Sequence, residues 1–251
     1  MNILLTNDDG IASEGIYALY LELKKIAKVT VVAPDSERSS IGHAITLAHP
    51  IRYKTLDRNG KFFGYGISGT PADCVKFGIS VLLKKKPDLV FSGINIGPND
   101  GCSVFYSGTV AGAREGALMG IPSVAISLNS YVKPYFLSAA RFAVKLAGQI
   151  RRNSLPNGTF LNVNVPNKPY QQIKGVKALR QGTTPIHGTF KKRKHPDLGS
   201  YYWMSGKTQL SKKNDQSDTF ALSKDYITVT PIHSDLTDYH VLEQLKSWHI
   251  T

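Results

Sequence analysis

Residues 2–10 read NILLTNDDG, an apolar run that ends in a cluster of turn-forming residues. Apolar residues then recur at the spacing of a helix, at Ile16, Leu19, Leu23 and Ile26. The β-branched run VTVVA at 29–33 predicts a second strand, which Pro34 stops. A strand, a helix and a strand joined by short links are typical of a parallel sheet.

This alternation continues to about residue 166. We expect further helices over 71–83, 107–119 and 134–150, and further strands over 88–91, 123–128 and 160–165. The chain is therefore predicted to be an α/β protein, with a Rossmann-like, mostly parallel sheet and helices on both faces.

Beyond Pro166 the composition changes. From Lys168 to Lys213 the chain has eleven Lys or Arg residues against one acid, Asp197, with aromatic residues interleaved. We expect a β-hairpin or extended arm here, then a strand near 226–232 and a closing helix near 236–248. Residues 1–166 are thus predicted to be the α/β core and residues 167–251 a C-terminal extension of the same structural domain.

The composition limits the class of protein. The 251 residues are 41% hydrophobic, which suffices for one sizeable core, and no apolar run approaches membrane-spanning length. Two cysteines and the absence of a signal-peptide pattern predict a cytoplasmic protein without a disulfide framework or a membrane partner. The net charge of +13 favours phosphorylated or polyanionic ligands.

Two adjacent carboxylates, Asp8 and Asp9, follow the first predicted strand. Ligands of open α/β sheets bind at the carboxyl ends of the strands. Adjacent carboxylates repel each other unless a cation lies beside them, and oxygen ligands suit Mg, Mn or Ca. The plainer alternative is a turn that caps a helix, with Gly10 at a positive φ.

Later strand ends carry further oxygen and nitrogen groups. Ser39 lies in the loop after the second strand, and the Gly-rich loop 92–101 holds Asn95 and Asn99. A hydroxyl and an amide oxygen can complete the shell of a hard cation, and an amide N–H can bind phosphate. Each segment alone also fits an ordinary turn.

A fourth loop, YSGTV at 106–110, precedes a helix of small residues. Ser107, Gly108 and Thr109 would lie at its N-terminus, where a hydroxyl caps the helix and free N–H groups attract an anion. A metal beside an anion site is the arrangement that phosphoryl hydrolysis uses.

The combination of motifs resembles the SurE family of survival-protein nucleotidases. The shared stretches are TNDDG at 6–10, APDSERSSIGHAIT at 33–46, GTPADCVKFG at 69–78, SGIN-x-GPN-x-G at 92–101 and YSGTVAGAREGALMGIPSVAIS at 106–127. Weaker likeness continues at LNVNVP (161–166), YYW (201–203) and VTPIH (229–233).

This resemblance implies a divalent-metal-dependent hydrolase of nucleoside 5′- and 3′-monophosphates, which in some members also cleaves short polyphosphate. It implies one Mg²⁺ or Mn²⁺ per subunit at Asp8, Asp9, Ser39 and Asn95, with Asp8 and Asp9 also catalytic. It places phosphate contacts near Asn99, Ser107, Gly108 and Thr109. It further implies a homodimer or homotetramer formed through the C-terminal arm.

Alternatives remain at this point. His43 is a candidate leaving-group acid, or a loop histidine with a structural hydrogen bond. An aspartyl-phosphate phosphatase needs a second Asp two positions on, where this chain has Gly10. A nucleic-acid or polyphosphate binding protein would use the basic segment 168–213 with its aromatic residues. A dinucleotide-dependent dehydrogenase is disfavoured, because no G-x-G-x-x-G follows the first strand.

Overall fold

The computed structural model describes residues 1–183, 185–208 and 216–248. It contains a nine-stranded mixed sheet in the order β3-β4-β2-β1-β5-β6-β7-β11-β8. The strands are β1 (Asn2–Thr6), β2 (Lys28–Pro34), β3 (Tyr53–Arg58), β4 (Lys61–Ile67), β5 (Leu89–Ile96), β6 (Ser123–Asn129), β7 (Thr159–Pro166), β8 (Val176–Ala178) and β11 (Ile227–His233). Strands β4, β2, β1, β5, β6 and β7 are parallel, and β3 and β11 run against their neighbours β4 and β7.

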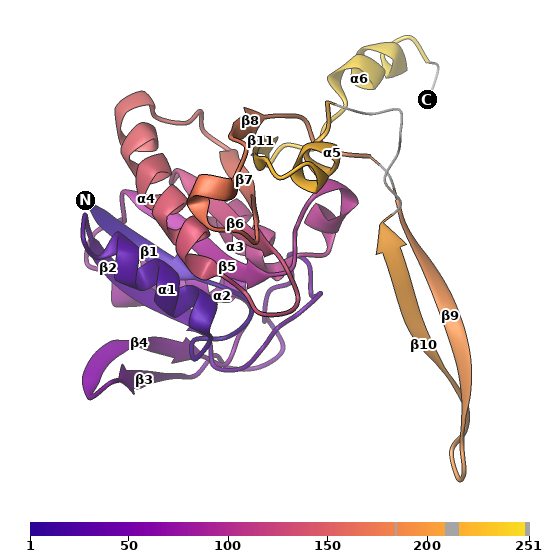
Figure 1. Cartoon of the computed structure of the whole chain (residues 1–251), viewed down its shortest axis with the longest axis horizontal. Helices are drawn as coiled ribbons and strands as arrows, with labels where there is room; N and C mark the ends of the chain where they lie inside the picture. The colour runs from indigo at the N-terminus through magenta and orange to yellow at the C-terminus, as the bar shows by residue number, and fades with distance from the viewer. Residues whose placement is uncertain (184, 209–215, 249–251) are drawn as a thin grey trace.

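Helices cover both faces of the sheet. One face carries α1 (Glu14–Leu23) and α4 (Phe136–Asn153), and the other carries α2 (Pro71–Phe77) and α3 (Gly108–Leu118) (Figure 1). Shorter helical segments are η1 (Gly78–Leu82), η2 (Gly101–Phe105), η3 (Tyr170–Gln172), α5 (Asp218–Ser223) and α6 (Tyr239–Leu245). The predicted α/β class, with helices on both faces, is confirmed.

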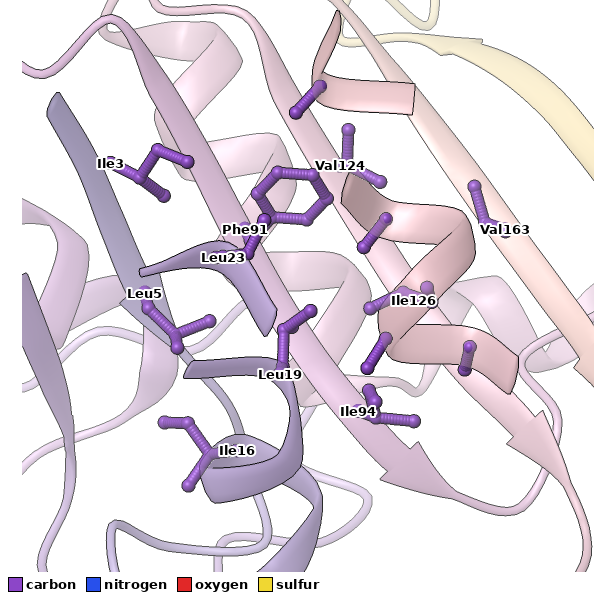
Figure 2. Packing of buried hydrophobic residues seen from close by; sticks show 14 of the residues in the cluster. Ile3, Leu5, Ile16, Leu19, Leu23, Phe91, Ile94, Val124, Ile126 and Val163 are labelled. Carbon is purple, nitrogen blue, oxygen red and sulfur yellow. The ribbon is translucent and has the colours of Figure 1, made fainter. Parts of the chain in front are cut away.

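The main core lies between the sheet and the α1–α4 layer. Side chains from the centres of the parallel strands, such as Phe91, Val124 and Ile126, form one buried cluster with Ile16 and Leu19 of α1 (Figure 2). These side chains are essentially inaccessible to solvent, so their burial supplies most of the driving force for folding. The core thereby fixes the carboxyl ends of β1 and β5 as neighbours, with Thr6 opposite Ser92.

The region after Pro166 contains the predicted arm. Strands β9 (Ile186–His195) and β10 (Gly199–Thr208) form an antiparallel hairpin that projects away from the sheet (Figure 1). Strand β11 then returns to the main sheet, and α6 is the predicted closing helix. Lys212 and Lys213 of the basic segment lie outside the described residues. The division of the chain near residue 166 stays a prediction.

Several predicted boundaries differ from the structure. The α-helix expected over 71–83 ends at Phe77 and continues as the π-helical turn η1. The closing helix spans only Tyr239–Leu245. Strand β5 extends to Ile96, so Asn95 lies at the end of a strand and not in the loop after it. The polar and Gly-containing sequence Ser92–Gly93 disguised this continuation, because it lacks the apolar character of a buried strand.

Candidate active site

Four segments meet at the carboxyl ends of β1 and β5. The backbone N–H of Thr109, in the first turn of α3, donates to Asp8 Oδ2 at 3.0 Å, and the Thr109 hydroxyl donates to Asp8 Oδ1. The backbone N–H of Arg38 donates to the Asp8 carbonyl at 2.8 Å. The backbone N–H of Ile96 lies near the Asp9 carboxylate and acts to lower its pKa. The loops of the four predicted motifs therefore converge on the two carboxylates.

Asp8 is a buried carboxylate, with only 5% of its surface exposed. Burial raises the pKa of Asp8 above its ordinary value, although the two hydrogen bonds from Thr109 act to lower it. Gly108 is required beside it, because a Cβ at that position would lie 2.9 Å from the Asp8 Cβ and 3.0 Å from Oδ2. The α3 N-terminus can approach Asp8 this closely only through a glycine.

Asp9 lacks the hydrogen bonds that a buried carboxylate needs. Burial raises its pKa to about 7, and the charge of Asp8 adds to this effect. Its Oδ2 atom is buried and has no hydrogen-bond partner. A buried, unpaired oxygen beside a second carboxylate costs free energy unless a proton or a cation binds there. The carboxylate pair therefore fits a cation.

The neutral ligands expected for this cation lie on the neighbouring segments. Asn95 donates its Nδ2 hydrogens to the carbonyls of Ile96 at 3.1 Å and Gly97 at 2.7 Å, which leaves its Oδ1 as an acceptor. Ser39 is exposed, and its hydroxyl donates to Glu37 Oε1 at 2.5 Å. Because the hydroxyl is the donor in this bond, its oxygen lone pairs are left for a cation.

The oxygen set restricts which metal fits. Among the residues that the structure describes, no group of three His, Cys, Asp or Glu side chains is arranged to hold a metal. A cation at Asp8 and Asp9 would therefore depend on neutral oxygens and water for its remaining ligands. Such an all-oxygen set suits Mg²⁺ or Mn²⁺.

Two of the residues predicted to contact phosphate, Ser107 and Thr109, make different contacts. Ser107 caps α3, since its Oγ accepts the Val110 N–H at 3.1 Å. Thr109 instead directs both its N–H and its hydroxyl toward Asp8. The sequence did not reveal that Thr109 holds a carboxylate in place.

Asn99 is held by an amide network that the sequence analysis missed. Its N–H donates to Asn164 Oδ1 at 2.7 Å, and its carbonyl accepts from Asn162 Nδ2 at 2.7 Å. Its side-chain Nδ2 donates to Ser127 Oγ at 2.9 Å. The alternation of Asn and Val in the predicted strand 160–165 was the available signal, because a buried strand seldom carries asparagine without a partner.

His43, in the loop after β2, belongs to an ion cluster around the buried Glu115 of α3, with Lys76 of α2 as the third member. Its Nε2 lies 2.8 Å from Glu115 Oε2, and Lys76 Nζ lies 2.6 Å from Glu115 Oε1. Burial acts to raise the pKa of Glu115, but the hydrogen bonds from His43 and Lys76 prevail and lower it. This geometry favours the structural alternative for His43 over the leaving-group acid.

A second junction joins the Asn99 loop to the base of the hairpin. Asp218 is fully buried and accepts from the N–H groups of Gly101 at 3.1 Å, Gly182 at 2.7 Å and Thr219 at 2.7 Å. Gln181 adds a hydrogen bond to the Gly101 carbonyl at 2.9 Å. The segments on either side of the hairpin are thus fastened to the loop that carries Asn99.

Comparison with known proteins identifies the family. The model of the family described as Survival protein SurE matches residues 3–187. The chain is 46% identical over its full length to a 5′-nucleotidase SurE of Syntrophobacter fumaroxidans, of which it covers 100%. It is 47% identical to that of Thermosipho melanesiensis, over 98% of the chain and 96% of that protein.

A solved structure shows the same relationship. The crystal structure of the SurE protein from Aquifex aeolicus aligns with a TM-score of 0.86 and 40% sequence identity, over 98% of both chains. No helix among the described residues is long and apolar enough to cross a membrane. The motifs at the strand ends, the sheet that brings them together and these full-length relatives agree, and the chain belongs to the SurE family.

Proposed function

We propose that this chain is a nucleotidase that hydrolyses nucleoside 5′- and 3′-monophosphates with one divalent cation bound at Asp8, Asp9, Ser39 and Asn95. The observation that carries the proposal is the Asp8–Asp9 pair directly beside the N-terminus of α3, in which Asp8 is buried and the buried Oδ2 of Asp9 is unpaired. The relatives at 46% and 47% identity that are named 5′-nucleotidases support the reaction type.

The chain's own groups have distinct roles in this proposal. A bound divalent cation would supply charge neutralisation at the phosphoryl oxygens and would acidify a water molecule. Free N–H groups at Ser107 and Gly108 would stabilise the charge that develops on those oxygens. Thr109 fixes the orientation of Asp8, and Asp9 Oδ2 either binds the cation or accepts the proton of the attacking water. Asn99, held by its amide network, would contact the phosphate.

The same arrangement would accept the terminal phosphoryl group of short polyphosphate. A second candidate function, binding of nucleic acid or polyphosphate by the hairpin, is favoured by one observation. Exposed Tyr202 and Trp203 lie opposite Lys192 and Lys191 in the β9–β10 register. The hairpin is also the segment through which we propose that the chain forms a homodimer or homotetramer.

A phosphate-release assay tests the proposed function. Purified protein would be stripped with EDTA and then assayed with 5′- and 3′-nucleotides in Mg²⁺, Mn²⁺ or chelator. We expect release from nucleoside monophosphates only with metal. RNA binding that weakens steeply with salt, with no phosphate release under any metal condition, would support the second candidate instead.

A further inference from the structure

Tyr131 lies against the loop that joins the two predicted asparagine sites. A Cβ built on Gly97 would lie only 2.4 Å from Tyr131 Cε1 and 2.9 Å from Cζ. Gly97 also has a φ of +97°, which glycine adopts without strain. The tyrosine ring can therefore approach the backbone between Asn95 and Asn99 because this position has no side chain.

Gly97 is tied to the candidate site by hydrogen bonds on both sides. Its carbonyl accepts from Asn95 Nδ2 at 2.7 Å, and its N–H donates to the Leu128 carbonyl at the end of β6 at 3.0 Å. The N–H of the preceding residue, Ile96, lies near the Asp9 carboxylate. Tyr131 thus contacts the backbone one residue away from a neighbour of Asp9.

The ring is nevertheless open to solvent. Tyr131 is 76% exposed, and among the described residues it takes part in no aromatic ring pair. An exposed aromatic ring beside the segment that carries Asn95 and Asn99 offers a flat surface to a planar ligand. Aromatic rings stack on nucleobases in this way, with little preference among bases because every base has a π-face.

We propose that Tyr131 stacks on the nucleobase of the substrate and so selects nucleotides over phosphate esters that lack a base. The inference rests on the proposed function. A nucleotide held by its phosphate at the N-terminus of α3 carries its base away from the reacting phosphorus by the width of the ribose. Tyr131 lies against the segment between Asn95 and Asn99, the residues that we propose bind the cation and the phosphate, so its exposed ring is the candidate surface for this base.

A rival aromatic surface directly precedes the N-terminus of α3. Phe105 and Tyr106 are 54% and 59% exposed and directly precede Ser107. Tyr106 also accepts the Gly42 N–H through its carbonyl at 2.9 Å, which links it to the loop that carries Ser39. Tyr106→Ala is therefore the matched comparison for Tyr131→Ala.

The test compares AMP with ribose 5-phosphate, which presents the same 5′-phosphate without a base. We expect Tyr131→Ala to raise the KM for AMP about tenfold, the loss of one stacked ring, and to change the KM for ribose 5-phosphate less than about twofold. Tyr131→Phe should match the unchanged protein. Calorimetric titration with AMP and ribose 5-phosphate should show the same difference in Kd.

Two outcomes would overturn the inference. An equal change for both substrates in Tyr131→Ala would show that the ring only supports Gly97, and loss of AMP preference in Tyr106→Ala alone would move the base to the rival surface. Failure of the proposed function looks different, because the unchanged protein would then release phosphate from neither substrate.

Discussion

Carboxylates are desolvated both at the carboxyl ends of β1 and β5 and on the helices α2 and α3. Their pKa values shift in opposite directions in the two regions. At the strand ends, burial raises the pKa of Asp8 and Asp9, and an Asp9 oxygen has no partner. On α2, burial also acts on Asp73, but hydrogen bonds from Thr46 and Thr70 hold its pKa below the ordinary value. On α3, hydrogen bonds and charges from His43 and Lys76 do the same for Glu115.

The direction of the pKa shift distinguishes carboxylates that stabilise the fold from carboxylates that are available to bind a ligand. Asp73 completes the capping box of α2 and accepts the Thr46 N–H at 3.0 Å and its hydroxyl at 2.6 Å. Asp9 has one backbone N–H near it and a like charge beside it. A carboxylate that lacks donors and a counter-charge indicates a functional site, whereas a buried carboxylate with all its hydrogen bonds made indicates a structural role.

The largest effect should come from Asp8. Asp8→Asn keeps the size of the side chain but removes one of the two charges that bind the cation, so we expect metal-dependent hydrolysis of AMP to fall by about 10³-fold or more. Circular dichroism and thermal melting serve as controls for folding. Hydrolysis that persists with the same metal dependence would contradict the assignment of the site.

Thr109 should have the next largest effect. Thr109→Val retains the N–H bond to Asp8 and loses the hydroxyl bond, so we expect Mn²⁺ affinity to fall by about 10- to 100-fold, as for other groups that orient metal ligands. Thr109→Ser keeps a hydroxyl and is the matched control. Equal Mn²⁺ affinity of the Val variant and the unchanged protein, measured by calorimetry, would remove Thr109 from this role.

Asp73 should affect stability. Asp73→Asn places an amide N–H₂ among N–H and hydroxyl donors, so we expect a loss of about 2 kcal/mol near pH 7. The folded-state pKa of Asp73 is lowered, so its contribution is fully present above the unfolded value of 3.8 and is lost as the pH falls through the folded value. Urea unfolding should show that the free energy of unfolding of Asp73→Asn is lower than that of the unchanged protein. This difference should be constant above pH 5 and shrink in acid.

The smallest effect, a few degrees in Tm, should come from Asp9→Asn. This change should stabilise the metal-free protein, whereas Asp73→Asn destabilises it. The pKa of Asp9 rises from 3.8 to about 7 on folding, so metal-free protein should lose stability as the pH rises between these values. Asp9→Asn removes this loss. In EDTA its Tm should equal that of the unchanged protein near pH 4 and exceed it at pH 8; a Tm advantage that does not vary with pH would contradict the proposed ionisation.

The parts of the site that the sequence predicted are those that local patterns determine. The apolar run before Asp8 marks the end of a strand, and Ser107 marks the start of a helix. Parallel topology brings such strand ends and helix starts to the same edge of the sheet. The hairpin of β3 and β4 was missed because Tyr53–Arg58 is largely polar and exposed, although Asn59-Gly60 is a hairpin turn signal.

Partners that meet only in three dimensions could not be predicted. Glu115 and His43 are 72 residues apart, and Asp218 and Gly101 are 117 residues apart. No periodicity in the chain encodes these pairs. Their identity depends on how α3, the loops and the base of the hairpin pack together.

The Asp218 junction has a consequence for how the molecule tolerates change. Because the Asp218 carboxylate accepts from the N–H groups of both Gly182 and Gly101, the two roots of the hairpin stay joined whatever lies between them. Insertions, deletions or wholesale exchange of residues between these roots should therefore leave the candidate site intact. The arm is in this sense an interchangeable module, and relatives or engineered variants can diversify it while the chemistry at the sheet edge is retained.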